Sequence, residues 1–159
     1  METSSIIIGL ACLVLIILPI FLLNLSRKRK GQNILSKIQS QATQNNGKIT
    51  DYEYWNNYAI GIDSQAGVVY YWSKMNKNEP FQKIELSKVA LCKITSLRDT
   101  DNTDSESLIL EFTFTDKTTN RKIVFFNSDH DGLTMHDEYQ LAEKWLKTVE
   151  KCRETIKSK

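Results

Sequence analysis

Hydrophobic residues first form an unbroken run, then alternate with polar residues, and finally recur at helical spacing. The unbroken run covers residues 6–25 and reads IIIGLACLVLIILPIFLLNL, twenty residues without a charge. At 1.5 Å per residue, a helix of this length spans roughly 30 Å, the thickness of the hydrocarbon core of a bilayer. The run therefore predicts a transmembrane helix.

Charges flanking this run predict its orientation. Glu2 precedes the run, and a basic cluster follows it. Cleaved signal peptides carry their basic residues before the apolar run, so we expect an uncleaved anchor. Because basic residues beside a span stay on the cytoplasmic side, we expect the N-terminus outside and the remaining chain inside. We also expect the cluster to lie at the membrane surface, where anionic lipid would add about 1 kcal/mol per charge. It consists of Arg27, Lys28, Arg29 and Lys30.

Alternating segments in the middle of the chain predict six β-strands. Tyr52, Tyr54, Tyr58, Ile60 and Ile62 share one parity, as a single half-buried strand requires. A hairpin turn is expected at residues 63–67, which read DSQAG. The other five strands are expected around 68–72, 81–86, 89–94, 108–114 and 123–126.

Two helices are expected on either side of these strands. The polar segment 31–47 carries a short apolar stripe and ends in Asn-Asn-Gly, which predicts a juxtamembrane helix. The last 23 or so residues place apolar side chains three or four positions apart, which predicts an amphipathic helix with Trp145 in the core. That stripe comprises Leu141, Trp145, Val149, Cys152 and Ile156.

Strands followed by one helix indicate an α+β domain. We expect three parts: a membrane anchor with its basic stop at 1–30, a linker helix at 31–47, and a soluble domain at 48–159. About 110 residues suffice for one ordinary domain.

The order of these elements resembles the pleckstrin-homology-like (PH-like) superfold. The segments that carry the resemblance are the hairpin 54–72, IELSKVALCKI, LILEFTF with KIVFFN, and Trp145 within LAEKWLKTV. The resemblance covers roughly residues 48–157. The arrangement of an anchor followed by this domain also looks similar to that of bacterial single-pass membrane proteins with short cytoplasmic domains. It implies an antiparallel barrel or sandwich closed by the C-terminal helix. The superfold has seven strands, so one of the predicted strands would have to be divided.

The resemblance also bears on ligands. Phosphoinositide-binding members place basic residues on the first two strands and in their connecting loop, whereas the loop DSQAG has none. Headgroup phosphates need several cationic donors. Recognition of a protein partner or self-association is therefore the favoured function, and lipid-headgroup sensing at the membrane surface is the alternative.

Charge and cysteine content exclude some other classes. Without Glu2 and the basic cluster, 17 basic and 18 acidic residues remain, so no positive excess attracts nucleic acid. Cys12, Cys92 and Cys152 lie in no metal-ligand spacing, and their odd number prevents a framework that pairs them all.

Candidate catalytic and metal-binding groups are sparse. His130 and His136 lie near three aspartates in SDHDGLTMHDE, but their spacing defines no ligand geometry. No nucleophile and base stand in a known catalytic arrangement. We expect no enzyme activity, metal or cofactor.

Aromatic residues crowd both parities of the segment 52–72, so one set must face away from the core. Either the juxtamembrane helix covers that set or it forms a partner surface, and the sequence leaves both possibilities open. The candidate partner-surface residues are Trp55, Tyr71, Tyr52 and Tyr54.

Overall fold

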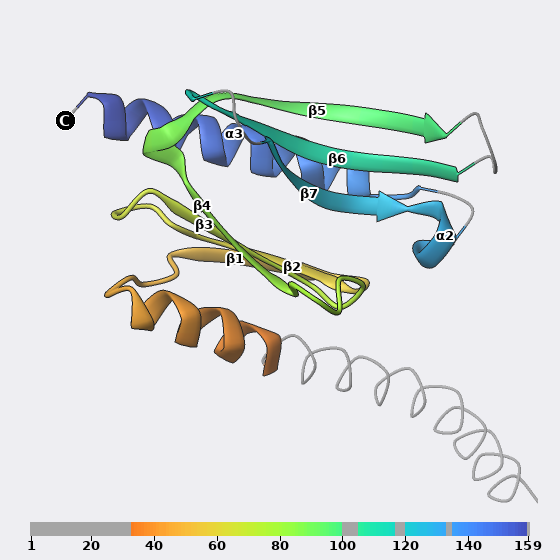
Figure 1. The fold of residues 1–159 in the computed structure, drawn as a ribbon, viewed down its shortest axis with the longest axis horizontal. Helices are drawn as coiled ribbons and strands as arrows, with labels where there is room; N and C mark the ends of the chain where they lie inside the picture. The colour runs from red at the N-terminus through yellow and green to blue at the C-terminus, as the bar shows by residue number, and fades with distance from the viewer. Residues whose placement is uncertain (1–32, 100–104, 117–119, 133–134, 159) are drawn as a thin grey trace, which may run out of the picture. The chain divides into compact units, whose positions relative to one another are not determined.

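Two antiparallel sheets and a long C-terminal helix make up most of the structure (Figure 1). It is a computed structural model that describes residues 33–99, 105–116, 120–132 and 135–158. The α+β class expected from the sequence is therefore confirmed. Within the described residues no strand of one sheet pairs with a strand of the other, so the strands do not close into a barrel.

The first sheet contains four strands, and the sequence had predicted three in this region. A two-residue turn at Asn56 and Asn57 divides the segment that was expected to be a single strand. Asn56 has φ +43°, a left-handed conformation that asparagine tolerates better than most residues. This division supplies the additional strand. In order across the sheet, the strands are β1 (Asp51–Trp55), β2 (Tyr58–Asp63), β3 (Val68–Ser73) and β4 (Phe81–Glu85).

This turn also changes which residues share a face. Tyr54 lies opposite Ala59, and Glu53 lies opposite Ile60, so even-numbered residues of β1 share a face with odd-numbered residues of β2. The expectation that Tyr52 and Tyr54 share a face with Tyr58, Ile60 and Ile62 is therefore wrong. We call the face that carries Ile60 the core face and the opposite one the outer face.

The turn at residues 63–67 is confirmed. The Asp63 carboxylate is buried and accepts hydrogen bonds from the backbone N–H groups of Lys48, Gln65 and Ala66 at 2.7 to 3.0 Å. Gly67 has φ +67°, and a Cβ there would lie 2.2 Å from Ile156 Cδ1. Only glycine fits this turn without strain.

The second sheet follows a short 3-10 helix, η1 (Leu86–Lys88). The last strand of this sheet contains a β-bulge. Leu108 pairs with Phe126, whereas the next residue, Ile109, pairs with Val124. Phe125 is the extra residue, so Phe125 and Phe126 can both be buried. The strands are β5 (Val89–Asp99), β6 (Ser105–Phe114) and β7 (Asn120–Asn127).

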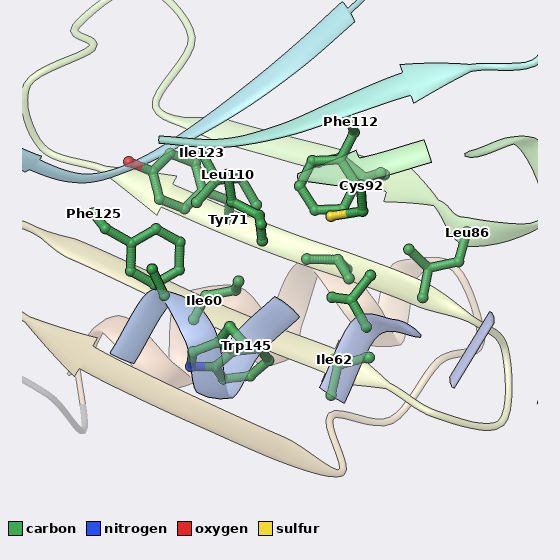
Figure 2. Close-up of a cluster of buried hydrophobic side chains, with 14 of the residues drawn as sticks. Ile60, Ile62, Tyr71, Leu86, Cys92, Leu110, Phe112, Ile123, Phe125 and Trp145 are labelled. Carbon is green, nitrogen blue, oxygen red and sulfur yellow. The ribbon is translucent and has the colours of Figure 1, made fainter. Parts of the chain in front are cut away.

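Two helices follow β7. The short helix α2 (Ser128–Asp131) was not predicted from the sequence. The long helix α3 (Glu138–Lys157) was predicted, and Trp145 is fully buried as expected. Tyr71, Phe125 and Trp145 belong to one core formed by both sheets and α3 (Figure 2).

A helical segment precedes β1. Residues 33–44 are helical, and those from Ile38 onward belong to the same compact unit as the sheets. Ile38 Cγ2 and Ile49 lie against Gly61, 3.5 and 3.3 Å from where its Cβ would stand. Glycine at this position therefore leaves room for the side chains of Ile38 and Ile49 on the outer face.

The expected membrane anchor, residues 6–25, lies outside the described residues. Among the helices that are described, none is long and apolar enough to span a bilayer.

Candidate functional site

The four aromatic residues expected on a partner surface lie in three different environments. Tyr71 is only 2% exposed, and its hydroxyl donates to the Val124 carbonyl at 3.0 Å. It lies opposite Ile60 on the core face, which the second sheet and α3 cover (Figure 2). The assignment of Tyr71 to an exposed surface is therefore corrected.

Tyr52 and Tyr54 lie on the outer face. Tyr52 is 46% exposed, and Tyr54 is partly buried with its hydroxyl donating to the Asn56 carbonyl at 2.9 Å. Tyr52 lies opposite Gly61, where Ile38 and Ile49 pack. Residues of this chain thus cover part of the outer face. Of the four aromatic residues proposed for a partner surface, Tyr52 is the most exposed.

Trp55 occupies the end of β1 on the core face, at the edge of the sheet. Its ring stacks on Phe125 with centroids 4.8 Å apart, and its Nε1–H donates to the Phe125 carbonyl at 2.8 Å. The bulge in β7 therefore provides both partners of this tryptophan. One part of the indole is fixed by these contacts, yet the residue remains partly exposed.

This exposed part of Trp55 lines a groove between β1 and the first turns of α3. The groove has a volume of about 550 Å³. That value lies within the range of roughly 300 to 1,000 Å³ that is usual for ligand pockets. We call it the β1–α3 groove; it is lined by Glu53, Trp55, Asn56, His136, Asp137, Glu138, Gln140, Leu141 and Lys144.

Two polar bridges connect β1 and its turn to α3 along this groove. The Lys144 ammonium pairs with the Glu53 carboxylate, and the Asn56 side-chain amide donates to Glu138 Oε1 at 3.1 Å. Leu141 lies between Glu138 and Lys144 in the sequence of α3 and also lines the groove. The lining therefore combines two apolar side chains, Trp55 and Leu141, with charged groups from both elements.

Hydrogen bonds favour the ionised forms of Lys144 and Glu138. The Glu53 carboxylate accepts from Lys144 and raises the pKa of that ammonium. Burial acts to raise the pKa of Glu138, but the backbone N–H of His136 and the Asn56 amide donate to this carboxylate and lower the pKa overall. The Glu138 carboxylate therefore stays charged to a lower pH than an ordinary glutamate does.

Groups that could support catalysis or metal binding are placed apart. His130 lies in α2 with Asp129 and Asp131, whereas His136 and Asp137 line the β1–α3 groove. Within the described residues, no three His, Cys, Asp or Glu side chains gather in a way that could hold a metal ion. Burial raises the pKa of the Cys92 thiol to about 12, so this cysteine is protonated at neutral pH.

The first two strands and the loop that joins them carry no basic side chains. The loop between the first two strands is Asn56–Asn57, not DSQAG as expected, and neither loop contains Lys or Arg. The strands β1 and β2 contain none either. The basic cluster Arg27, Lys28, Arg29 and Lys30 lies outside the described residues.

Only Trp55 among the groove residues was identified from the sequence as a candidate for partner binding. Glu53 and Asn56 are its neighbours in the sequence, but the remaining lining residues come from α3 and the segment before it. Glu138 is 82 positions from Asn56, and Lys144 is 91 positions from Glu53. The Asn-Asn pair after Trp55 is a turn signal that could have placed this tryptophan at a strand end. No local pattern indicates that α3 begins opposite it.

Comparisons of the chain with protein-family models, curated proteins and solved structures give no match.

Proposed function

We propose that this protein is a membrane-tethered, non-enzymatic interaction protein whose PH-like domain binds a polypeptide segment in the β1–α3 groove. The observation that carries the proposal is the lining of the groove, where a partly exposed tryptophan and a leucine lie among charged groups. Binding sites in proteins typically combine apolar anchors with a few oriented polar groups. Tryptophan is also enriched among the residues that dominate binding energy.

The PH-like assignment is supported by element order. Four antiparallel strands, then three, then a C-terminal helix with a buried tryptophan correspond to the order of the superfold named above. The division of the first predicted strand also gives the seven strands that the superfold has. In this proposal α3 covers the opening between the two sheets and provides one wall of the groove.

The tether is proposed from the sequence. The uncharged run 6–25 would be the span, and the four basic residues from Arg27 to Lys30 would keep the domain on the cytoplasmic side. A reporter fused after Lys159 tests this topology. Activity of a reporter that works only in the cytoplasm is expected, whereas activity only of an exported reporter would refute the orientation.

Partner binding is tested by blocking the groove without disturbing the core. Gln140 is exposed and lines the groove, so Gln140→Trp should fill it at the rim. Thr155 is also exposed on α3 but lines a different hollow, which makes Thr155→Trp the matched control. Full-length protein would be captured from membranes and its associated proteins quantified by mass spectrometry.

The expected result is an associated protein, or a second copy of this chain, that is lost with Gln140→Trp and retained with Thr155→Trp. Retention of every associated protein by both variants would contradict binding in the groove. Equal losses with both variants, together with an unchanged circular dichroism spectrum, would also contradict it, because the effect would not be specific to this site.

A further inference from the structure

The charges that line the β1–α3 groove indicate what kind of segment it takes. Glu53, Asp137 and Glu138 contribute three carboxylates, whereas Lys144 contributes one ammonium group. Together these four groups carry a formal net charge of −2. An occupant with positive charge is therefore electrostatically complementary to the groove.

Lys144 already occupies one of these carboxylates, Glu53. Both members of this ion pair are partly exposed, at 53% for the Lys144 side chain and 34% for that of Glu53. Exposed ion pairs contribute little to stability, because water screens both charges. A cation from outside can thus replace Lys144 on Glu53 with only a small penalty.

Asp137 provides a further carboxylate that the fold does not use for capping. It stands at the N-cap of α3, and its side chain makes no capping hydrogen bond. It is exposed beside Glu138, whose own carboxylate is held by Asn56 and His136. The start of α3 therefore presents two adjacent carboxylates to the groove.

Trp55 and Leu141 add an apolar surface to this acidic rim. An aliphatic side chain can pack against them, and an indole also attracts a nearby guanidinium or ammonium group. Arginine satisfies both features, because its stem is apolar and its planar guanidinium can bind a carboxylate through two hydrogen bonds.

We infer that the β1–α3 groove binds a cationic polypeptide segment of a protein partner, in which an Arg or Lys replaces Lys144 on Glu53 and a neighbouring apolar residue packs against Trp55 and Leu141. This inference rests on the proposed function and names the ligand class of the same site. Lys144 then acts as an internal competitor that the partner displaces.

Three fluorescein-labelled hexapeptides test the inference: Ala-Leu-Arg-Leu-Arg-Ala and its counterparts with Gln or Glu in place of Arg. Each would be titrated with the full chain in a zwitterionic detergent and followed by fluorescence anisotropy, with empty micelles as the blank. We expect the Arg peptide to bind, the Gln peptide to bind more weakly, and the Glu peptide not to bind.

Variants of the ion pair give the sharpest part of the test. Lys144→Ala should tighten binding of the Arg peptide by about threefold, because the competitor is gone. Glu53→Gln and Glu138→Gln should each weaken it by a similar factor. Lys147→Ala and Glu143→Gln change the same charges on exposed positions of α3 outside the groove and should have no comparable effect.

Several outcomes would overturn the inference. Equal binding of the Arg and Gln peptides would remove the charge preference but leave peptide binding in the groove intact. Unchanged or weaker binding by Lys144→Ala would refute displacement of Lys144, and an equal gain with Lys147→Ala would mean that only overall charge matters. Binding of no peptide would refute the cationic ligand class, while the capture experiment above would still decide the proposed function.

Discussion

Helix α3 borders two hollows whose linings differ in chemistry. Its first turns border the β1–α3 groove, of about 550 Å³, with a tryptophan, a leucine and four charged side chains. Its last turns border a smaller hollow of about 330 Å³, which we call the second hollow. The second hollow is lined by Ser64, Thr148, Lys151, Cys152 and Thr155.

The difference is the one expected between the proposed binding site and a gap in packing. Thr148 and Thr155 in the second hollow donate their hydroxyls to carbonyls of their own helix, so these groups are already used. Its lining contains no aromatic side chain and no carboxylate. In the groove, an aromatic anchor lies beside charges that face the same space, and this combination is what oriented recognition needs.

The largest effect is expected from Trp145, which lies on α3 between residues that line the two hollows. Trp145 is fully buried between the two ends of α3, so Trp145→Ala should lower the free energy of unfolding by about 3 to 5 kcal/mol. Chemical denaturation of the full chain followed by circular dichroism measures this change. A loss below about 1 kcal/mol would mean that α3 does not hold the core together.

A substitution at Trp55 should have a smaller effect, because this residue packs at the margin of the core and lines only the β1–α3 groove. Trp55→Ala removes the stacking on Phe125 and the bond to its carbonyl, and we expect a loss of about 2 to 3 kcal/mol because the residue is only partly buried. Trp55→Phe keeps a ring and should cost about 1 kcal/mol, the value of the lost hydrogen bond. Equal stability of the two variants would contradict the role assigned to the stacked ring.

A substitution at Gly67 should lower stability through the turn 63–67, which contributes Ser64 to the second hollow. Gly67→Ala places a Cβ against Ile156 in a left-handed backbone conformation, which should cost about 2 kcal/mol. Binding of the Arg peptide at the β1–α3 groove should remain unchanged in the same titration. Lost peptide binding in a variant that still folds would show that the two hollows are coupled.

The smallest effect is expected from the ion pair across the groove. Glu53→Gln and Lys144→Ala should each change the free energy of unfolding by less than about 1 kcal/mol, because both side chains are partly exposed. The double variant should differ little from either single one. A coupling above about 2 kcal/mol would instead make this pair a structural contact that no partner displaces.

Patterns within single elements were predictable from the sequence. The stripe that includes Trp145 predicted α3, and alternation in LILEFTF predicted β6. The strand expected around 123–126 ends in two adjacent phenylalanines, Phe125 and Phe126, and the structure accommodates both of them through a bulge. Two adjacent large residues in a strand do not reveal from sequence alone how the backbone accommodates them.

Relations between elements were not predictable in the same way. Tyr52 and Tyr58 are both even-numbered, but a two-residue turn lies between them. After this turn, even-numbered side chains lie on the opposite face of the sheet. The β1–α3 groove depends on contacts such as that between Glu53 and Lys144, which are 91 positions apart. Periodicity carries no information about such pairs, so Trp55 was identified but most of its neighbours were not.

Photo-crosslinking in intact membranes tests the central claim most directly. A photoreactive phenylalanine analogue would replace Gln140 in the groove or Thr155 at the second hollow, and the adducts formed by the full chain would be compared. Binding in the groove predicts a discrete adduct from position 140 that Glu53→Gln weakens and that position 155 does not form. An adduct from position 155 with none from position 140 would contradict it.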